Sequence, residues 1–449
     1  MRGRQDLPAI EGGTPRRKKF LVFGSPQIKQ AEIKEVVHSL KTGWLGTGPK
    51  VDKFETLIRD YLGVKCAKAV NSCTAGLHLS LLVSGVGPSD EVIVPTMTFA
   101  ATANVVEHVG AKPVFVDCEL DSMNIDPSKI EEKITKRTRA IIPVHIAGRP
   151  CKMDEIIRIA RRYKLKIIED AAHAFGAEYK GRKIGTIGDL TAFSFYVTKN
   201  LPTGEGGMVT TNNKKYSDFI ELYALHGLSR GAWKRYSDEG FKHYLVQAPG
   251  YKYNMMDLQA AIGIHQFARF TENQKKRREI WEMYNFAFRD LPLLRPADPE
   301  SNTINGYHLY TILVDTNKLK ANREVIQAAL HAENIGIGIH FVALHLHPFY
   351  RRKYGYKRGD FPNAEFISDR TISLPFSAKL TDQDVKDVVS AVRKVLLYYS
   401  AHKPKPRKIS LSKAAPEDIN KNGEVKKKGL RIKTSRRILT ATRIQKVMH

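Results

Sequence analysis

Residues 164–176 read KLKIIEDAAHAFG, in which an apolar strand ends in two carboxylates, Glu169 and Asp170, and is followed by His173. In α/β sheets, ligands bind outside the carboxyl ends of the strands. An acidic side chain at this position is therefore placed to bind a cation or to orient a cofactor. Taken alone, Asp170 is equally suited to capping a following helix.

Short apolar strands alternate with helices on both sides of this stretch. A helix is predicted, for example, over residues 153–163. The alternation favours an α/β domain built on a mostly parallel, seven-stranded sheet. The strands are expected at residues 67–70, 92–94, 113–116, 140–144, 166–169, 191–195 and 208–210.

The pattern changes after about residue 265. Residues 263–291 predict one long helix that could join two domains, and the chain that follows reads as a smaller α+β domain. The last helix of this domain is signalled by Thr381 and Asp384, which have the spacing of a capping box, and by an apolar stripe behind them. The other expected elements are a strand at 308–314, a helix at 323–333 and a short strand near 336–341.

The 449 residues thus divide into a basic lead-in (1–20), a large domain (21–269), the smaller domain (270–400) and a basic tail (401–449). Residues 402–449 carry a net charge of +12, which leaves +15 of the total +27 for the rest of the chain. Such a charge run is typical of a solvated, flexible segment, so the basic total does not make the body a nucleic-acid binder. A role of the tail at RNA, DNA or anionic lipid stays open.

Composition excludes several classes of protein. Hydrophobic residues make up 42% and charged residues 27%, an ordinary globular balance, so a disordered chain, a disulfide scaffold and a fibrous repeat are excluded. No run approaches the roughly 18 apolar residues of a membrane span, and the basic N-terminus lacks the apolar run of a secretory signal. The four cysteines have no CxxC pairing, which excludes zinc ribbons and favours reduced thiols in the cytoplasm: Cys66, Cys73, Cys118 and Cys151.

A second strand end carries a lysine. Residues 190–200 read LTAFSFYVTKN and are followed by the glycine-rich TGEGG of 203–207. A lysine after a buried strand is placed to lose solvation, which lowers its pKa and makes the amine nucleophilic. Taken alone, Lys199 is more often an ordinary surface lysine.

A third strand end opens a helix with hydroxyl groups. Residues 70–85 read VNSCTAGLHLSLLVSG. The free N–H groups of a helix start, together with hydroxyls, suit phosphate; ordinary capping by Ser72 or Thr74 would give the same pattern. Together, however, a reactive lysine, an acid at a strand end and a phosphate-ready helix start are the three requirements of pyridoxal 5′-phosphate.

At these residues the sequence resembles the DegT/DnrJ/EryC1/StrS family of pyridoxal-phosphate-dependent nucleotide-sugar aminotransferases, from about Phe23 to Leu397. The resemblance implies the aspartate-aminotransferase-like fold (fold type I), with the cofactor in the large domain, and a homodimer with shared active sites. Its seven motifs occur in family order: TGWLGTGPKVDKFE (42–55), VPTMTFAATAN (94–104), IIPVHIAG (141–148), EDAAHAFG (169–176), GDLTAFSFYVTKNLPTGEGGMV (188–209), PGYKYNMMDLQAAIG (249–263) and ALHLHPFY (343–350).

The resemblance also implies roles for single residues. Lys199 falls on the Schiff-base lysine, Asp170 on the carboxylate that pairs with the pyridine nitrogen, and His173 near the 3-oxygen of the cofactor. Ser194, Cys73 and Thr74 match the phosphate cup. The family often has glycine at the position of Cys73, so the backbone of that turn is favoured over its side chain.

Further roles follow from the same motifs. Phe99 matches an aromatic residue that stacks on the pyridine, or is a plain core aromatic. Asn254, or Lys252 in its place, matches the residue that reaches the phosphate of the neighbouring subunit. Four more side chains fall in motifs near the sugar nucleotide, each as easily structural as in contact: Trp44, His226, Arg230 and His345.

The implied activity is transfer of an amino group, with L-glutamate as donor, to a nucleotide-linked ketosugar. The KYNM form of the sixth motif resembles members that act on 4-keto-6-deoxy sugars. Two alternatives are a deoxysugar dehydratase, in which histidine replaces the Schiff-base lysine, and a non-catalytic scaffold with a nucleic-acid-binding tail. The presence of Lys199 disfavours the dehydratase, and Lys199, Asp170 and Ser194 together disfavour the scaffold.

Overall fold

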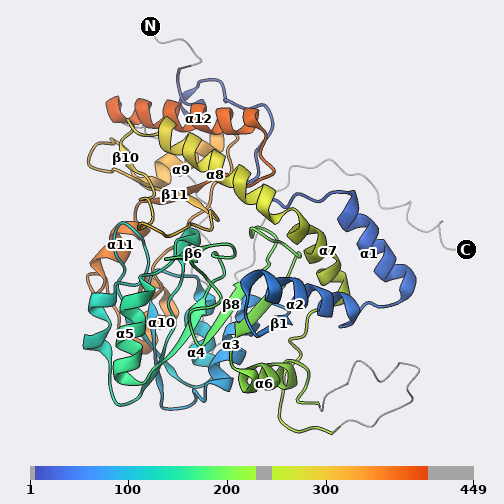
Figure 1. Cartoon of the computed structure of the whole chain (residues 1–449). Coiled ribbons are helices and arrows are strands. Elements are labelled where there is room, and N and C mark those ends of the chain that lie inside the picture. Colours follow the sequence, from blue (N-terminus) through green and yellow to red (C-terminus); the bar gives the residue numbers. More distant parts are fainter. Residues whose placement is uncertain (1–5, 229–244, 403–449) are drawn as a thin grey trace, which may run out of the picture. The chain divides into compact units, whose positions relative to one another are not determined.

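The computed structural model describes residues 6–228 and 245–402 (Figure 1). Its centre is a seven-stranded sheet in the order β1-β9-β8-β5-β4-β2-β3. Only β9 runs antiparallel to its neighbours, so the prediction of a mostly parallel sheet is confirmed. The strands are β1 (Cys66–Val70), β2 (Glu91–Pro95), β3 (Lys112–Val116), β4 (Thr138–Ile141), β5 (Lys166–Asp170), β8 (Leu190–Ser194) and β9 (Gly207–Thr211).

Helices cover both faces of this sheet (Figure 1). Because successive side chains of a strand point to opposite faces, Val92 and Val94 of β2 join one apolar cluster and Ile93 joins the other. Burial on both sides explains why these strands are continuous apolar runs. The first cluster includes α3 (Cys73–Val83), α4 (Ala100–His108) and α6 (Lys214–Ala224); the second includes α2 (Pro49–Leu62), α5 (Met153–Tyr163) and α7 (Asp257–Ala268).

The long helix predicted over 263–291 is instead two helices. Arg269, with φ −105° and ψ 6°, separates α7 from α8 (Phe270–Ala287). Its guanidinium donates to the buried carboxylate of Glu32 at 2.5 Å and to the carbonyl of Gln27 at 3.2 Å. The break lies at the boundary that the sequence predicts between the two domains.

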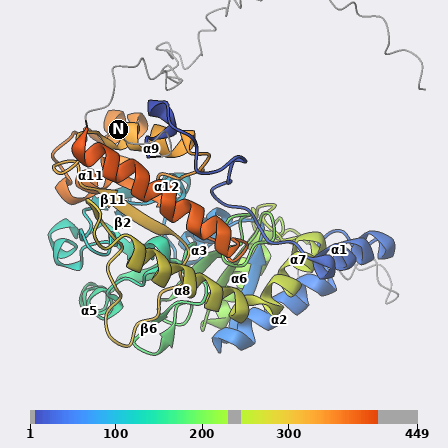
Figure 2. The same cartoon turned by 90° about the horizontal axis from the view of Figure 1, so that it is seen from above.

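The chain after α8 builds a second, smaller sheet with its own apolar cluster. The strands β10 (Leu293–Leu294), β11 (Tyr310–Val314) and β12 (Thr371–Leu374) pair antiparallel. The helices α9 (Arg323–Ala332), α12 (Asp382–Ala401) and α8 pack with them, and α8 and α12 run side by side (Figure 2). The predicted capping box of α12 is confirmed, since Thr381 and Asp384 bond reciprocally.

The prediction of a short strand near residues 336–341 is wrong. This segment makes only single bridges, Leu21 to Ile335 and Gly338 to Ser373. Gly336 lies so close to the N-terminal segment that a Cβ there would be 2.7 Å from the carbonyl oxygen of Leu21. The remaining elements are η1 (Ala9–Glu11), α1 (Gln30–Thr42), η2 (Pro127–Lys129), η3 (Glu131–Lys133), η4 (Ile146–Gly148), β6 (Glu178–Tyr179), β7 (Arg182–Lys183), η6 (Leu344–Leu346), α10 (Pro348–Tyr354) and α11 (Pro362–Ser368).

The N-terminal segment, predicted only as a basic lead-in, packs against the apolar cluster of the small sheet (Figure 2). The Glu333 carboxylate accepts hydrogen bonds from the backbone N–H groups of Ala9 (2.7 Å) and Arg16 (2.8 Å). It also forms an ion pair with the amine of Lys394 at 2.9 Å. The side chains of Glu333 and Lys394 are 0% and 1% exposed. A buried ion pair of this kind is satisfied only while all its partners are in place.

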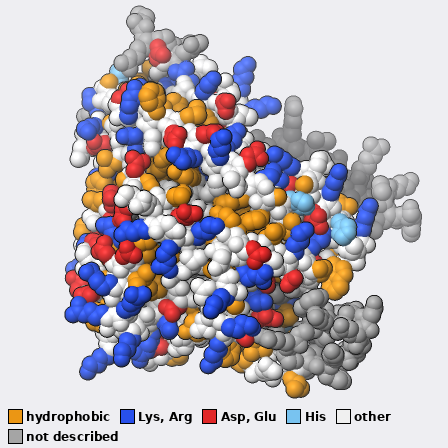
Figure 3. Space-filling model, in the orientation of Figure 1, with side chains coloured by type: hydrophobic (Ala, Val, Ile, Leu, Met, Phe, Trp, Pro, Cys, Tyr) orange, Lys and Arg blue, Asp and Glu red, His pale blue; other side chains and the backbone are white. Residues whose placement is uncertain are grey.

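Charge and hydropathy on the surface agree with the sequence analysis. On the face in Figure 3, lysine and arginine are interspersed with acidic side chains and do not gather into one basic patch. Within residues 6–228 and 245–402, no helix has both the length and the apolar character needed to cross a membrane.

Replacing Lys394 by methionine tests the role of the N-terminal segment. The Glu333 charge would stay buried without its cation, and removal of one partner of a buried pair typically lowers the free energy of unfolding by about 3–5 kcal/mol. The measurement is chemical denaturation. Lys214→Met, in the exposed pair with Asp218, is the matched control and is expected to change stability far less. Equal effects of the two variants would contradict a stabilising role for the buried pair.

Candidate active site

Three of the predicted site residues and the cap of α3 lie at one edge of the large sheet. Asp170 ends β5, Lys199 follows β8, Phe99 precedes α4 after β2, and Ser72 caps α3 after β1. These four strands run parallel to one another, so their carboxyl ends share an edge. This edge is where ligands bind in open α/β sheets.

Lys199 carries a desolvated amine. Its Nζ lies 3.5 Å from Nε2 of His308, and burial lowers the pKa of Lys199 to about 8, against the opposing effect of the Asp170 charge. About a tenth of an amine with this pKa is neutral at pH 7. The amine can therefore act as a nucleophile and exchange protons near neutral pH.

Each carboxylate oxygen of Asp170 accepts a hydrogen bond from the protein. Its Oδ2 accepts a hydrogen bond from Thr102 Oγ1 (2.7 Å), and its Oδ1 accepts one from the backbone N–H of Ala172 (3.2 Å). Thr102 in turn contacts Thr98 at 2.8 Å between hydroxyl oxygens. Burial raises the pKa of Asp170, while these donors and the Lys199 charge act in the opposite direction. The chain after Asp170 forms turns instead of a helix, so the alternative of helix capping does not apply.

The start of α3 forms the third part of the site. Ser72 caps the helix by accepting from the N–H of Ala75 at 3.1 Å, whereas Thr74 does not cap it. A Cβ on Gly207 would lie 2.5 Å from the carbonyl carbon of Ser72, so only glycine lets β9 approach this turn. Ser194 is the register partner of Gly207 and so lies beside the helix start. The orphan N–H groups of such a turn suit an anion.

Cys73 points away from this turn. Its Sγ lies 3.4 Å from the carbonyl oxygen of Ala192 and 3.9 Å from Asp170 Oδ1. Burial and the Asp170 charge raise the pKa of the thiol, which keeps it protonated as a donor. The thiol thus supports Asp170, and only the backbone of Cys73 is available to an anion at the helix start.

Two aromatic rings flank the site. His173 accepts the N–H of Ala147 at Nδ1 (3.2 Å) and packs 4.5 Å from the ring of His308. Burial and the Lys199 charge lower the pKa of His173 well below its usual range, so the ring is neutral. Phe99 is 61% exposed and lies 6.0 Å from Phe341, so one large apolar face is open.

Four residues of the site are missing from the sequence prediction: Thr102, Asn200, His308 and His340. Thr102 lies one helical turn beyond Phe99, a spacing that could have placed it on the same side of α4. His308 precedes β11, and His340 lies in the segment mistaken for a strand. Burial and the Lys199 charge lower the pKa of His340 to about 4. The last two come from the small domain, and the pattern of the sequence does not tell which of its loops approaches the large sheet.

The four residues predicted near a sugar nucleotide differ in where the structure places them. Trp44 and His226 have exposed side chains on loops, and Arg230 lies outside the described residues. For His345 the geometry favours the structural alternative over substrate contact: its ring is fully buried, with Nδ1 2.9 Å from Thr96 Oγ1 and Nε2 3.0 Å from Glu365 Oε1. Both nitrogens are occupied by the protein itself, so the imidazole links Thr96, at the end of β2, to Glu365 in α11 and has no nitrogen free for a substrate.

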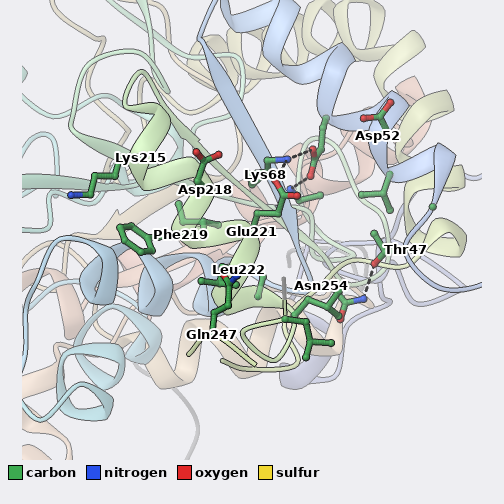
Figure 4. A pocket seen from close by; sticks show the side chains of 18 residues that line it. Thr47, Asp52, Lys68, Lys215, Asp218, Phe219, Glu221, Leu222, Gln247 and Asn254 are labelled. Atoms are coloured by element: carbon green, nitrogen blue, oxygen red, sulfur yellow. Dashed lines mark hydrogen bonds and ion pairs between the residues drawn. The ribbon is translucent and has the colours of Figure 1, made fainter. Parts of the chain in front are cut away.

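Asn254 lines a cavity of about 610 Å³ between α2, β1 and α6 (Figure 4). Its Nδ2 donates to Thr47 Oγ1 at 2.7 Å, and its Oδ1 is buried without a hydrogen-bond partner among the described residues. Asn254 also forms a β-bridge with Val70, next to the start of α3. The carbonyl of Lys252 accepts from Asn71 Nδ2 at 3.3 Å, which ties the same segment to the end of β1.

The chemistry of these groups fits pyridoxal phosphate. An amine is present for its aldehyde, a carboxylate for its pyridine nitrogen, and a helix start for its phosphate. The model of the DegT/DnrJ/EryC1/StrS aminotransferase family matches residues 26–393. The chain belongs to this family. The predictions of the family, of the fold and of a pyridoxal-phosphate-dependent sugar aminotransferase are thereby confirmed.

The matches to individual relatives extend over nearly the whole length of each relative. The uncharacterized protein MJ1066 of Methanocaldococcus jannaschii is 54% identical over 380 residues, 85% of this chain and 98% of its own. The spore coat polysaccharide biosynthesis protein SpsC of Bacillus subtilis is 48% identical over 382 residues, with the same coverage. Among solved structures, the chain is similar to a candidate sugar aminotransferase, Spr1654 of Streptococcus pneumoniae, which has been solved in a PLP form and a PMP form. Against the PLP form the sequence identity is 32% and the TM-score is 0.78, over 84% of this chain and 99% of Spr1654.

Thr102→Val tests the support of Asp170. Valine keeps the shape but removes the donor, so the pKa of Asp170 rises further and the carboxylate holds a protonated ring nitrogen less well. Loss of a hydrogen bond to a charged group predicts about a tenfold to hundredfold weaker affinity. The measurement is the dissociation constant for pyridoxamine phosphate, which forms no covalent bond to Lys199. Thr98→Val, which loses only the contact to Thr102, is the control; equal losses in both variants would mean that Thr102 acts by packing alone.

Proposed function

We propose that this aminotransferase moves the amino group of L-glutamate to a nucleotide-linked 4-keto-6-deoxy sugar and so makes an aminosugar for polysaccharide, glycoconjugate or antibiotic biosynthesis. The observation that carries the proposal is the buried amine of Lys199 at the same sheet edge as the Asp170 carboxylate and the start of α3. The likeness to SpsC supports a role in polysaccharide synthesis. The buried free cysteines of the described chain are consistent with the cytoplasm.

When bound, pyridoxal phosphate supplies an electron sink for the carbon that loses its proton. Lys199 takes that proton as a neutral amine and, once charged, returns it to a neighbouring atom, so one group serves as base and acid. Its pKa of about 8 suits both steps because each protonation state is populated near neutral pH. Burial keeps bulk water from exchanging the proton.

The other residues bind and orient. Asp170, anchored by Thr102 and Ala172, accepts a hydrogen bond from a protonated pyridine nitrogen and so favours positive charge on the ring. The first N–H groups of α3, with Ser194 and Thr74, hold the phosphate. Phe99 offers its exposed face for stacking, and the neutral His173 lies near the 3-oxygen. Trp44, His226 and Arg230 are proposed to contact the sugar nucleotide.

A shared active site in a homodimer is part of the same proposal. Membership of the family supports it, because the position of Asn254 matches the residue that reaches the phosphate of the neighbouring subunit. A row of exposed apolar side chains on α1 also supports it: Ile33 (47% exposed), Val37 (41%) and Leu40 (57%). Apolar faces of this kind are typical of obligate subunit contacts.

Leu40→Asp tests the dimer. A charge on the proposed contact is expected to shift the mass measured by light scattering from two chains to one and to lower activity, since each site would lose its neighbour. Phe286→Asp, at an exposed apolar position on α8 of the small domain, is the control and should leave the mass unchanged. A dimer that survives Leu40→Asp would place the contact elsewhere.

The proposed reaction is tested by the visible spectrum of the purified protein. We expect a yellow protein that loses this colour with L-glutamate and regains it with a nucleotide-linked 4-ketosugar. Lys199→Ala should bind the cofactor without turnover. A protein that takes up no pyridoxal phosphate would contradict the function as a whole. A coloured protein indifferent to glutamate would retain the cofactor and overturn the donor, and recovery only with a 3-ketosugar would overturn the ring position.

A further inference from the structure

Asn200, the neighbour of Lys199, has an amide whose orientation is fixed. Its Nδ2 donates to the carbonyl of Gly306 and lies 3.4 Å from Gln274 Oε1. Both of these atoms are acceptors, so only the nitrogen of the amide can face them. Gln274 Nε2 donates to the same carbonyl at 3.0 Å, which orients the second amide as well. The oxygen of Asn200 must therefore point the other way.

That oxygen defines the tautomer of His308. Asn200 Oδ1 lies 3.3 Å from His308 Nδ1 and can only accept, so Nδ1 carries the hydrogen. The ring is 3% exposed, and burial together with the Lys199 charge lowers the pKa of His308 well below its usual range. A neutral ring with hydrogen on Nδ1 has a bare Nε2. This nitrogen lies 3.5 Å from Lys199 Nζ, so it can only accept from the lysine.

We infer that Asn200 and His308 form a positioning pair for Lys199, in which Asn200 fixes the His308 tautomer and the bare Nε2 accepts a hydrogen bond from the amine. The inference rests on the proposed role of Lys199 as base and acid. The pair holds the amine toward one side whenever it is not covalently engaged, which directs its lone pair and protons at the site. His308 touches neither reacting carbon nor substrate in this role.

The backbone around His308 is held independently of its imidazole. The buried Arg277 Nη1 lies within 3.2–3.5 Å of the carbonyl oxygens of Tyr307, His308 and Phe376. The N–H of His308 also donates to the carbonyl of Ala147 at 3.0 Å. Removal of the ring therefore leaves the loop anchored. The titratable and charged groups that face Lys199 and His308 are Cys73, Asp170, His173, His340 and Arg277.

The first experiment measures cofactor uptake by the apoenzyme and, separately, kcat of the loaded enzyme. The rate at which Lys199 combines with added pyridoxal phosphate depends on its neutral form, so it rises with pH to a midpoint near 8. An acceptor at Nε2 stabilises the charged amine, so His308→Leu should lower this midpoint by about one pH unit. At the same time kcat should fall about tenfold, because the amine is less well oriented. General damage to the site would slow both reactions and leave the midpoint in place.

The second experiment observes the tautomer directly. Two-bond proton–nitrogen NMR spectra of histidine-labelled apoenzyme should contain one buried neutral ring with hydrogen on Nδ1 that disappears in His308→Leu. Asn200→Leu removes the acceptor and, above pH 8 where the Lys199 amine is neutral and can itself accept, should move hydrogen to Nε2. Gln274→Leu should leave it on Nδ1 because Gly306 still holds the Asn200 amide. Asn200→Leu also keeps the test open if His308→Leu does not fold.

Either of two results would overturn the inference: hydrogen on Nε2 of His308 in the unaltered protein, or an unchanged midpoint and kcat in His308→Leu. Failure of the proposed function looks different. The unaltered apoenzyme would then take up no pyridoxal phosphate at all, while its NMR spectrum would still report the His308 tautomer.

Discussion

A lysine amine in a protein interior loses the water that would stabilise its charge, and this loss at Lys199 governs the arrangement around it. Burial lowers the pKa of the neighbouring imidazoles of His173 and His308, and the Lys199 charge lowers it further, so both rings are neutral. The Asp170 carboxylate is the compensating negative charge, and it stays at the site because Thr102 and Ala172 supply its hydrogen bonds. Each of these groups would be unstable in its place without the others.

The desolvated amine of Lys199 also connects the large sheet with the small sheet, because its neighbours come from both. Lys199 and Asp170 belong to the large sheet, whereas His308 and His340 come from loops beside the small sheet. Arg277, on the helix after the break at Arg269, donates to the carbonyl oxygens of Tyr307, before β11, and Phe376, after β12. The orientation of α8 is therefore coupled to the position of the imidazole that contacts Lys199. This explains why an apparently plain connecting helix contains a fully buried arginine.

The large sheet could be predicted from sequence because parallel strands with helices on both faces must be continuous apolar runs, and because a polar residue at a strand end marks an edge of the sheet. Asp170 and Lys199 could be identified from the sequence for that reason. Thr102, Asn200 and His308 were not, since their roles arise from approaches between distant segments. For His345 the sequence left a structural role and substrate contact equally open, because a family motif does not show whether the hydrogen bonds of a histidine are internal, as both are here. The break at Arg269 depends on Glu32, more than 200 residues earlier, and left no local signal.

The N-terminal segment has a consequence for synthesis on the ribosome. Ala9 and Arg16 bond to Glu333, and Tyr399 donates to Glu11, so the segment that precedes the large sheet must wait for α12, more than 300 residues later, before it is in place. The large domain can fold while the chain is still growing, but the small domain cannot be completed until translation has passed α12. A fragment of residues 270–400 made alone would lack part of its own core, and the start of the chain is the piece to restore.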